Sequence, residues 1–92
     1  MTIAEFEVAD SREFEGALLA LWWDAKGAWA KAHEIAQEVE GVDGAWVHAY
    51  LHRKEGDVGN AAYWYGQAGK EAATGDLRLE WEGMVREMLG RR

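Results

Sequence analysis

Three histidines are the residues best suited to chemistry in this 92-residue chain. His48 and His52 are four positions apart, so on a helix their imidazoles project from one face, one turn apart. Glu55 lies three positions further along. Two neutral imidazoles and a carboxylate suit Zn²⁺ and leave a coordination position open, and His33 from a neighbouring helix is a candidate further ligand. The more frequent role of such a histidine pair is hydrogen bonding within a helix interface, and spacing alone supports the metal site.

Other catalytic arrangements are missing from the sequence. His33 is followed four positions later by Gln37, where the zinc metalloprotease pattern needs a second histidine, and an amide is a poor zinc ligand. The absence of cysteine excludes thiol nucleophiles, disulfides and thiolate metal sites. No glycine-rich phosphate loop occurs, and the single serine, Ser11, stands where helix capping explains it. We therefore predict no catalytic residues and no cofactor.

Aromatic residues form a second candidate surface. Tyr63–Tyr65 are consecutive, and at about 100° per residue they cover about 200° of a helix, which is wider than one core-facing stripe. Trp22 and Trp23 are also adjacent, so their rings cannot both point along one core-facing stripe. The first expectation is that a C-terminal helix containing Trp81 covers these rings. The alternative is that an aromatic patch remains for a partner or ligand. The predicted interface residues are Trp22, Trp23, Arg53, Asn60, Tyr63 and Trp64.

The charge balance restricts the partners. Ten Lys and Arg against seventeen Asp and Glu give a net charge of −7, which repels phosphate backbones and anionic lipid. We therefore predict no nucleic-acid and no membrane binding, and a homodimer or a complex with another protein instead. No apolar run approaches the ~18 residues of a membrane span, and residues 1–10 lack the features of a signal peptide. A cytoplasmic location is expected.

The elements that must position these side chains are short helices separated by glycine, since the chain contains no proline. The helices predicted from apolar spacing cover residues 11–25, 28–40, 44–55, 58–69 and 76–90. Their expected N-caps are Asp10, Asp43, Asp57 and Asp76. The glycines expected to end helices are Gly27, Gly41, Gly56 and Gly90. Residues 1–10 alternate apolar and acidic side chains without a partner strand, which predicts an extended arm.

An internal repeat with an offset of 29 residues places Gly27 over Gly56 and Ala32 over Ala61. Each repeat unit is predicted to be an αα-hairpin that turns at glycine, with a small residue where its two helices approach. The hairpins cover residues 11–40 and 43–69, and residues 76–90 form a capping helix. We therefore predict a single all-α domain over residues 1–92 with about five helices.

The second hairpin resembles half a tetratricopeptide repeat, on Gly56-Asp57, Ala61, Tyr65 and Ala68. The first helix departs from that pattern at Ala45, His48 and His52, and the closing proline is absent. The longer run GAWVHAYLHRKEGD, N-A-x-Y-W-Y and A-G-K, with A-H-x-x-x-Q upstream, is similar to a family of small bacterial all-helical proteins over roughly residues 17–70. That resemblance implies a helical fold and a candidate surface, and no activity.

Two functions from different classes follow from these features. The first is a non-catalytic protein-interaction or self-association module that uses the aromatic surface. The alternative is a small-molecule or metal-binding protein, or an enzyme, with its site between the two hairpins. The residues of that alternative site are His33, His48, His52, Arg53 and Glu55.

Overall fold

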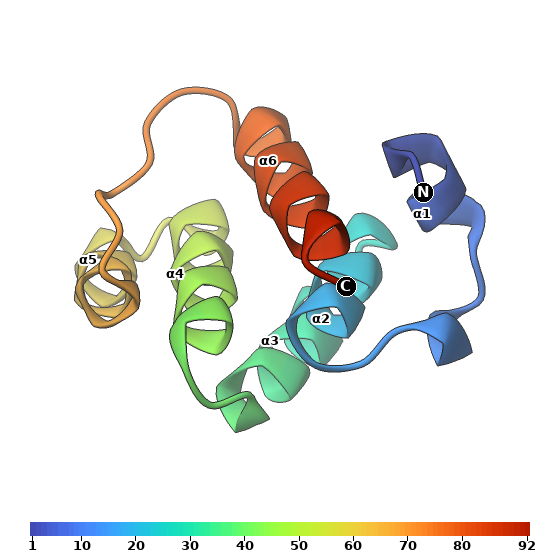
Figure 1. Cartoon of the computed structure of the whole chain (residues 1–92). Coiled ribbons are helices and arrows are strands. Elements are labelled where there is room, and N and C mark those ends of the chain that lie inside the picture. The colour runs from blue at the N-terminus through green and yellow to red at the C-terminus, as the bar shows by residue number, and fades with distance from the viewer.

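The computed structural model describes all of residues 1–92, and its regular elements are all helical (Figure 1). The α-helices are α1 (Ile3–Val8), α2 (Gly16–Ala25), α3 (Trp29–Glu38), α4 (Val42–Glu55), α5 (Val58–Ala68) and α6 (Leu77–Gly90). A short 3₁₀ turn covers Ser11–Glu13. The predicted all-α class is therefore confirmed. None of the helices combines the length and apolar character needed to cross a lipid bilayer.

The helices are arranged as two hairpins joined through α3 and α4. Helix α3 packs against α2 in the first hairpin, and α5 packs against α4 in the second. Helix α6 lies across α2 and α4 and also contacts α1, whereas α5 lies at one end of the molecule beside α4 (Figure 1). The C-terminal helix thus covers the first helix of each hairpin, and one face of α5 is left uncovered.

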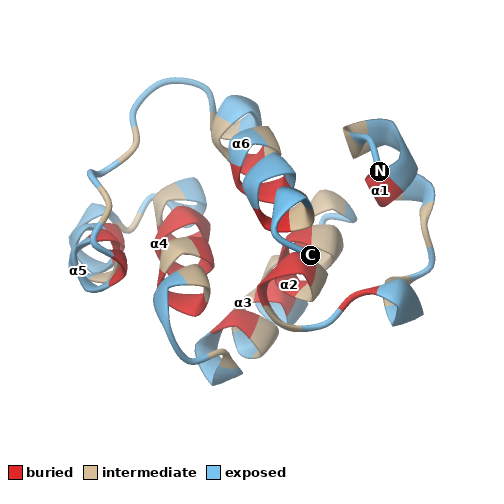
Figure 2. Ribbon diagram, viewed as in Figure 1, coloured by how far each residue is buried: buried red, intermediate tan, exposed pale blue.

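The main core lies where α1, α2, α4 and α6 meet. Its fully buried side chains are Phe6, Leu21, Val47, Leu51, Trp81, Met84 and Val85. Figure 2 shows the buried residues on the inward faces of α2, α4 and α6, whereas most of α5 is exposed. A smaller cluster of Ala49, Ala61 and Tyr65 joins α5 to α4. Helix α5 is therefore held by few buried side chains.

The N-terminal segment is a helix, so the prediction of an extended arm over residues 1–10 is wrong. Thr2 and Glu5 form a capping box, in which the Thr2 hydroxyl accepts from the Glu5 amide at 3.1 Å and the Glu5 carboxylate accepts from the Thr2 amide at 2.8 Å. Phe6 is fully buried, with its ring centroid 4.7 Å from Phe14 and 5.8 Å from Trp81. One buried aromatic ring and a local cap thus stabilise a short helix.

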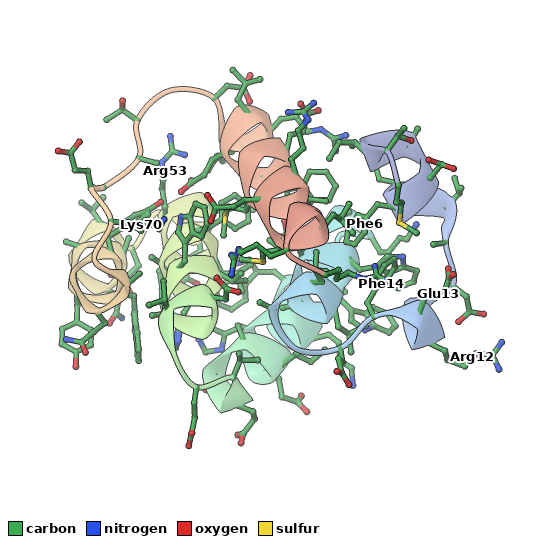
Figure 3. The ribbon with its side chains drawn as sticks, viewed as in Figure 1. Phe6, Arg12, Glu13, Phe14, Arg53 and Lys70 are labelled. Atoms are coloured by element: carbon green, nitrogen blue, oxygen red, sulfur yellow. The ribbon has the colours of Figure 1, made fainter.

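The first predicted helix, 11–25, begins later than expected. Asp10 accepts from the Arg12 amide at 2.8 Å, but it caps only the 3₁₀ turn. Phe14 then adopts an extended backbone, with φ −125° and ψ 157°, and packs beside Phe6 (Figure 3). Helix α2 starts at Gly16, whose φ of +62° favours glycine. Burial of Phe14 therefore interrupts a helix that the apolar spacing makes continuous.

The remaining helix ends largely follow their local signals. The carboxylates of Asp57 and Asp76 accept from the backbone amides two or three residues ahead, as predicted. Asp43 is not the cap of α4, because Gly41 takes that position and the Asp43 carboxylate pairs with Arg91 at 2.8 Å. Gly90 does not end α6 in a left-handed conformation, since it lies within the last turn of the helix.

The internal repeat has matching packing in both hairpins. Ala32 of α3 is fully buried, and Ala61 of α5, at the equivalent position, is buried against Ala49 of α4. A small side chain at each position allows the helices of a hairpin to approach closely. The likeness to a tetratricopeptide repeat stays a prediction.

Candidate functional site

Three histidines converge between α3 and α4. His33 comes from α3, whereas His48 and His52 come from α4, and one ring nitrogen of each lies within 4.8 Å of the others. The closest pair is Nε2 of His33 and Nε2 of His48, at 3.0 Å. The structure therefore brings together all three histidines selected from the sequence, across the junction of the two hairpins. We call these three residues the histidine cluster.

Helix periodicity positions two members of the cluster and packing positions the third. His48 and His52 stand one turn apart on the buried face of α4, with their rings stacked at a centroid distance of 4.9 Å. They are only 7% and 8% exposed. His33 is half-buried and meets both rings edge to face, at 4.7 Å and 5.1 Å. The cluster is thus part of the packed interface between α3 and α4.

Two tryptophans enclose the cluster. Trp29 stacks on His33 with an interplanar angle of 10° and a centroid distance of 4.9 Å, and its indole N–H donates to the Leu51 carbonyl at 2.7 Å. Trp64 of α5 stacks on His48 at 4.1 Å and 14°. Trp29 was not among the site residues predicted from the sequence, although its position one helical turn before His33 was a usable signal. Both indoles restrict rotation of the imidazoles.

Glu55 lies behind the cluster. Its carboxylate is 2.6 Å from Nδ1 of His52, so His52 carries a proton on Nδ1 and donates it to Glu55. This bond leaves Nε2 of His52 as the nitrogen with a free lone pair. Metal-binding histidines are commonly oriented by such a carboxylate. Glu55 thus orients His52, and its predicted role as a direct ligand stays a prediction.

The surroundings of His33 and His48 favour their neutral imidazoles. Burial lowers the pKa of His48 to about 4, and charge repulsion from His33 and His52 adds to this shift. Burial is also the main cause of a lowered pKa at His33, where repulsion from His52 acts in the same direction and Glu55 opposes it. His33 and His48 are therefore neutral near pH 7. In the contact between them one ring donates an N–H and the other accepts it.

A cleft of about 430 Å³ adjoins the cluster at His48. Its walls are the end of α3, the turn that connects α3 to α4, the start of α4, and Trp64 and Gln67 of α5. Glu40 is the single charged residue in this lining. The cleft is therefore a mostly uncharged hollow beside a group of three imidazoles.

The structure does not bring Arg53 to the histidines. Its guanidinium pairs with the Glu80 carboxylate at 2.8 Å and also donates to the Gly75 carbonyl, which ties α4 to the start of α6 (Figure 3). Tyr65 donates its hydroxyl hydrogen to the same Glu80 carboxylate. Arg53 is thus part of a polar contact between α4, α5 and α6.

The predicted aromatic surface is divided between separate parts of the molecule. Tyr63 is 57% exposed on α5, whereas Trp64 is half-buried against His48. Trp22 and Trp23 are half-buried on α2, where the Trp22 indole donates to the Ala9 carbonyl at 3.1 Å. The Asn60 side chain donates to Asp57 at 2.8 Å at the start of α5. Tyr63 is thus the one predicted interface aromatic with most of its ring open to solvent.

No family model, curated protein or solved structure matches this chain.

Proposed function

We propose that the protein binds a divalent transition-metal ion through His33, His48 and His52, with Zn²⁺ as the best fit. The observation that carries the proposal is the convergence of three imidazole nitrogens within 4.8 Å, including the 3.0 Å His33–His48 pair. Zn–N bonds of about 2.0–2.1 Å in a tetrahedral site place ligand nitrogens about 3.3 Å apart. Small side-chain rotations would therefore bring the cluster to metal-binding geometry.

The surroundings of the cluster support this function. Glu55 holds His52 in the tautomer that presents Nε2, and the stacked Trp29 and Trp64 limit the motion of the other two rings. Neutral imidazoles suit Zn²⁺, Cu²⁺ and Ni²⁺, whereas Ca²⁺ and Mg²⁺ prefer oxygen ligands. Three protein ligands leave a fourth position for water or another molecule, which is the usual pattern of reactive zinc sites.

A purely structural role explains less of this arrangement. It accounts for the hydrogen bonds of His33 with His48 and of His52 with Glu55, each of which satisfies a buried polar atom. It gives no reason for three imidazoles at one point, because apolar side chains of similar size fill a helix interface without the cost of burying polar groups. Metal binding supplies that reason.

The test is calorimetric titration of the metal-free full-length chain with Zn²⁺. We expect one ion per chain with micromolar or tighter affinity, and loss of that binding in His33→Gln and His52→Gln. Glu38→Ala is the matched control, because Glu38 is exposed on α3 and lies outside the cluster. Far-UV circular dichroism verifies that each variant is helical. Absence of wild-type binding, or equal binding by the histidine variants, would contradict the proposal.

A second proposal is that the chain self-associates through the outer face of α5. Residues 58–68 carry no charge in a chain of net charge −7, and Val58 and Tyr63 are 75% and 57% exposed there. Two copies can meet at this face without direct repulsion between carboxylates, and an isologous contact needs only one such patch. Non-catalytic self-association is thus supported by an observation independent of the histidines.

Sedimentation equilibrium tests the second proposal. At about 100 μM, a dimer with a micromolar dissociation constant would be the main species. Added salt is expected to strengthen it by screening the acidic remainder of the surface. Tyr63→Ala should weaken the dimer, whereas Val8→Ala, at an exposed position on α1, should not. A wild-type chain that stays monomeric at this concentration contradicts the proposal.

A further inference from the structure

The cleft meets the histidine cluster at one end. Gln37, in its wall, lies one helical turn after His33 on α3, and Ala45 lies almost one turn before His48 on α4. Glu55, which binds His52, lies beyond the opposite end of the cluster on α4. The hollow is therefore next to His48 and far along α4 from the carboxylate that orients His52.

Protein groups occupy several other sides of the cluster. Trp29 stacks on His33 and meets His52 edge to face at 6.1 Å, and Trp64 stacks on His48. Glu55 occupies the Nδ1 side of His52. The cleft opens at His48, so it would give a metal held by the three histidines an access route for a further ligand.

The chemistry of the cleft selects among possible ligands. Glu40 is its single charge, Gln37 and Gln67 supply amides, and no lysine or arginine is among the lining residues. An anion would therefore find no positively charged partner in this lining besides the metal ion itself, and Glu40 and the net charge of −7 would repel it. Trp64 adds an aromatic surface at the junction with His48. A small uncharged nitrogen base, above all a planar one, matches these features.

The wall of the cleft at the junction of α3 and α4 contains a tight backbone contact. A Cβ added at Gly44, at the start of α4, would lie 2.0 Å from the Val39 carbonyl oxygen, so the turn between the helices rests directly on the backbone of α4. The volume of about 430 Å³ lies within the range of small-molecule sites. The cleft is thus formed by a tight backbone contact and has room for a small ligand.

We infer that the fourth coordination position of the metal site faces this cleft and takes a small nitrogen base, such as an imidazole or an amine, in preference to an anion. The inference rests on the proposed metal-binding function. The base binds as its free form through the nitrogen lone pair, displaces a coordinated water to solvent, and leaves the metal oxidation state unchanged. If the base is protonated in solution, it releases that proton to the solvent on binding.

The test uses the full-length chain loaded with Co²⁺, whose visible spectrum reports changes in its ligands, titrated separately with imidazole and azide. Imidazole is expected to alter the spectrum with saturation at a concentration at least about tenfold lower than azide. Glu40→Gln removes the negative charge from the cleft. It should reduce the difference in affinity between imidazole and azide, mainly because azide binds more tightly. Equal or tighter binding of azide by the wild-type chain would overturn the inference.

A second pair of variants locates the ligand. Gln67→Trp fills the cleft from an exposed position on α5 and should weaken imidazole binding about tenfold or more without altering Co²⁺ binding. Ala62→Trp, exposed on the same helix and outside the cleft lining, should behave as wild type. An unchanged imidazole response in Gln67→Trp would show that the ligand does not enter by the cleft.

The experiment distinguishes failure of the proposed metal binding from failure of the inference about the fourth coordination position. A chain that shows no cobalt spectrum defeats the metal site and, with it, this inference. A chain that binds Co²⁺ but gives no spectral change up to about 100 mM imidazole retains the proposed function and defeats only the inference about the fourth position.

Discussion

Nε2 of His33 and Nε2 of His48 lie 3.0 Å apart, although the two residues are fifteen positions apart in the chain and belong to different hairpins. Two neutral imidazoles make such a contact by sharing one N–H hydrogen, and protonation of both rings would turn it into repulsion. A metal ion bound by the histidine cluster would lie between these two nitrogens, in place of the shared hydrogen. The contact therefore links the stability of the hairpin junction to pH and to metal binding.

Metal-free protein should lose stability as the pH falls through the histidine range. The folded-state pKa of His48 is about 4, below its unfolded value of about 6.5, so the unfolded chain binds more protons between these values. The contribution of His48 is fully present above about pH 6.5 and is lost progressively down to about pH 4, by an amount on the order of 1–3 kcal/mol. Urea unfolding with a chelator at pH 7.5 and 4.5 measures this loss.

The control for this pH dependence is His48→Gln. Carboxylates that titrate below pH 5 contribute equally to both chains, so the difference between wild type and variant isolates the imidazole. His33, whose pKa burial also lowers, remains in the variant and contributes the residual dependence near the cluster. A variant with the full wild-type loss of stability would exclude His48 as its source.

Phe6→Ala should destabilise the chain by about 3–5 kcal/mol, because it empties a fully buried position against Phe14 and Trp81. Val8→Ala, at an 85% exposed position on the same helix, should change stability by less than about 0.5 kcal/mol. Chemical denaturation followed by tryptophan fluorescence measures both. Equal effects of the two substitutions would mean that α1 does not pack on the core.

Ala61→Leu should cost about 1–3 kcal/mol, because the added side-chain volume must enter the buried contact with Ala49. Ala62→Leu places the same volume on the exposed face of α5 and should be nearly neutral. Thermal unfolding by circular dichroism compares them. An unchanged melting temperature in Ala61→Leu would refute the close approach of α4 and α5.

Two glycine-to-alanine substitutions should change the free energy of unfolding in opposite directions. Gly44→Ala places a Cβ 2.0 Å from the Val39 carbonyl oxygen, so backbone must move and stability should fall by about 1–3 kcal/mol. Gly83→Ala lies in the exposed middle of α6 with no atom within 4 Å of the new Cβ, and should stabilise by about 0.5–1 kcal/mol. Urea unfolding of both variants checks the signs. Stabilisation by Gly44→Ala would disprove the tight contact at the cleft wall.

The amino-acid sequence by itself determined the features that depend on neighbouring residues. The spacing of His48 and His52 places both imidazoles on one face of a helix, whatever the rest of the chain does. Asp57 and Asp76 cap helices through amides two or three positions away, and the left-handed Gly56 ends α4 as predicted. These features were predictable because a helix turn involves only about four consecutive residues.

Only the tertiary structure decided which distant residues meet. The approach of His33 to His48, and the stacking of Trp64 on the same imidazole, depend on how α3, α4 and α5 pack. Arg53 lies one residue after His52 on α4, yet it points to Glu80, because adjacent side chains on a helix are about 100° apart. Phe14 likewise has an extended instead of a helical backbone, because its side chain is buried beside Phe6. Apolar periodicity identifies the buried face of each helix but not its partner, and the partners determine where the histidine cluster and its cleft can form.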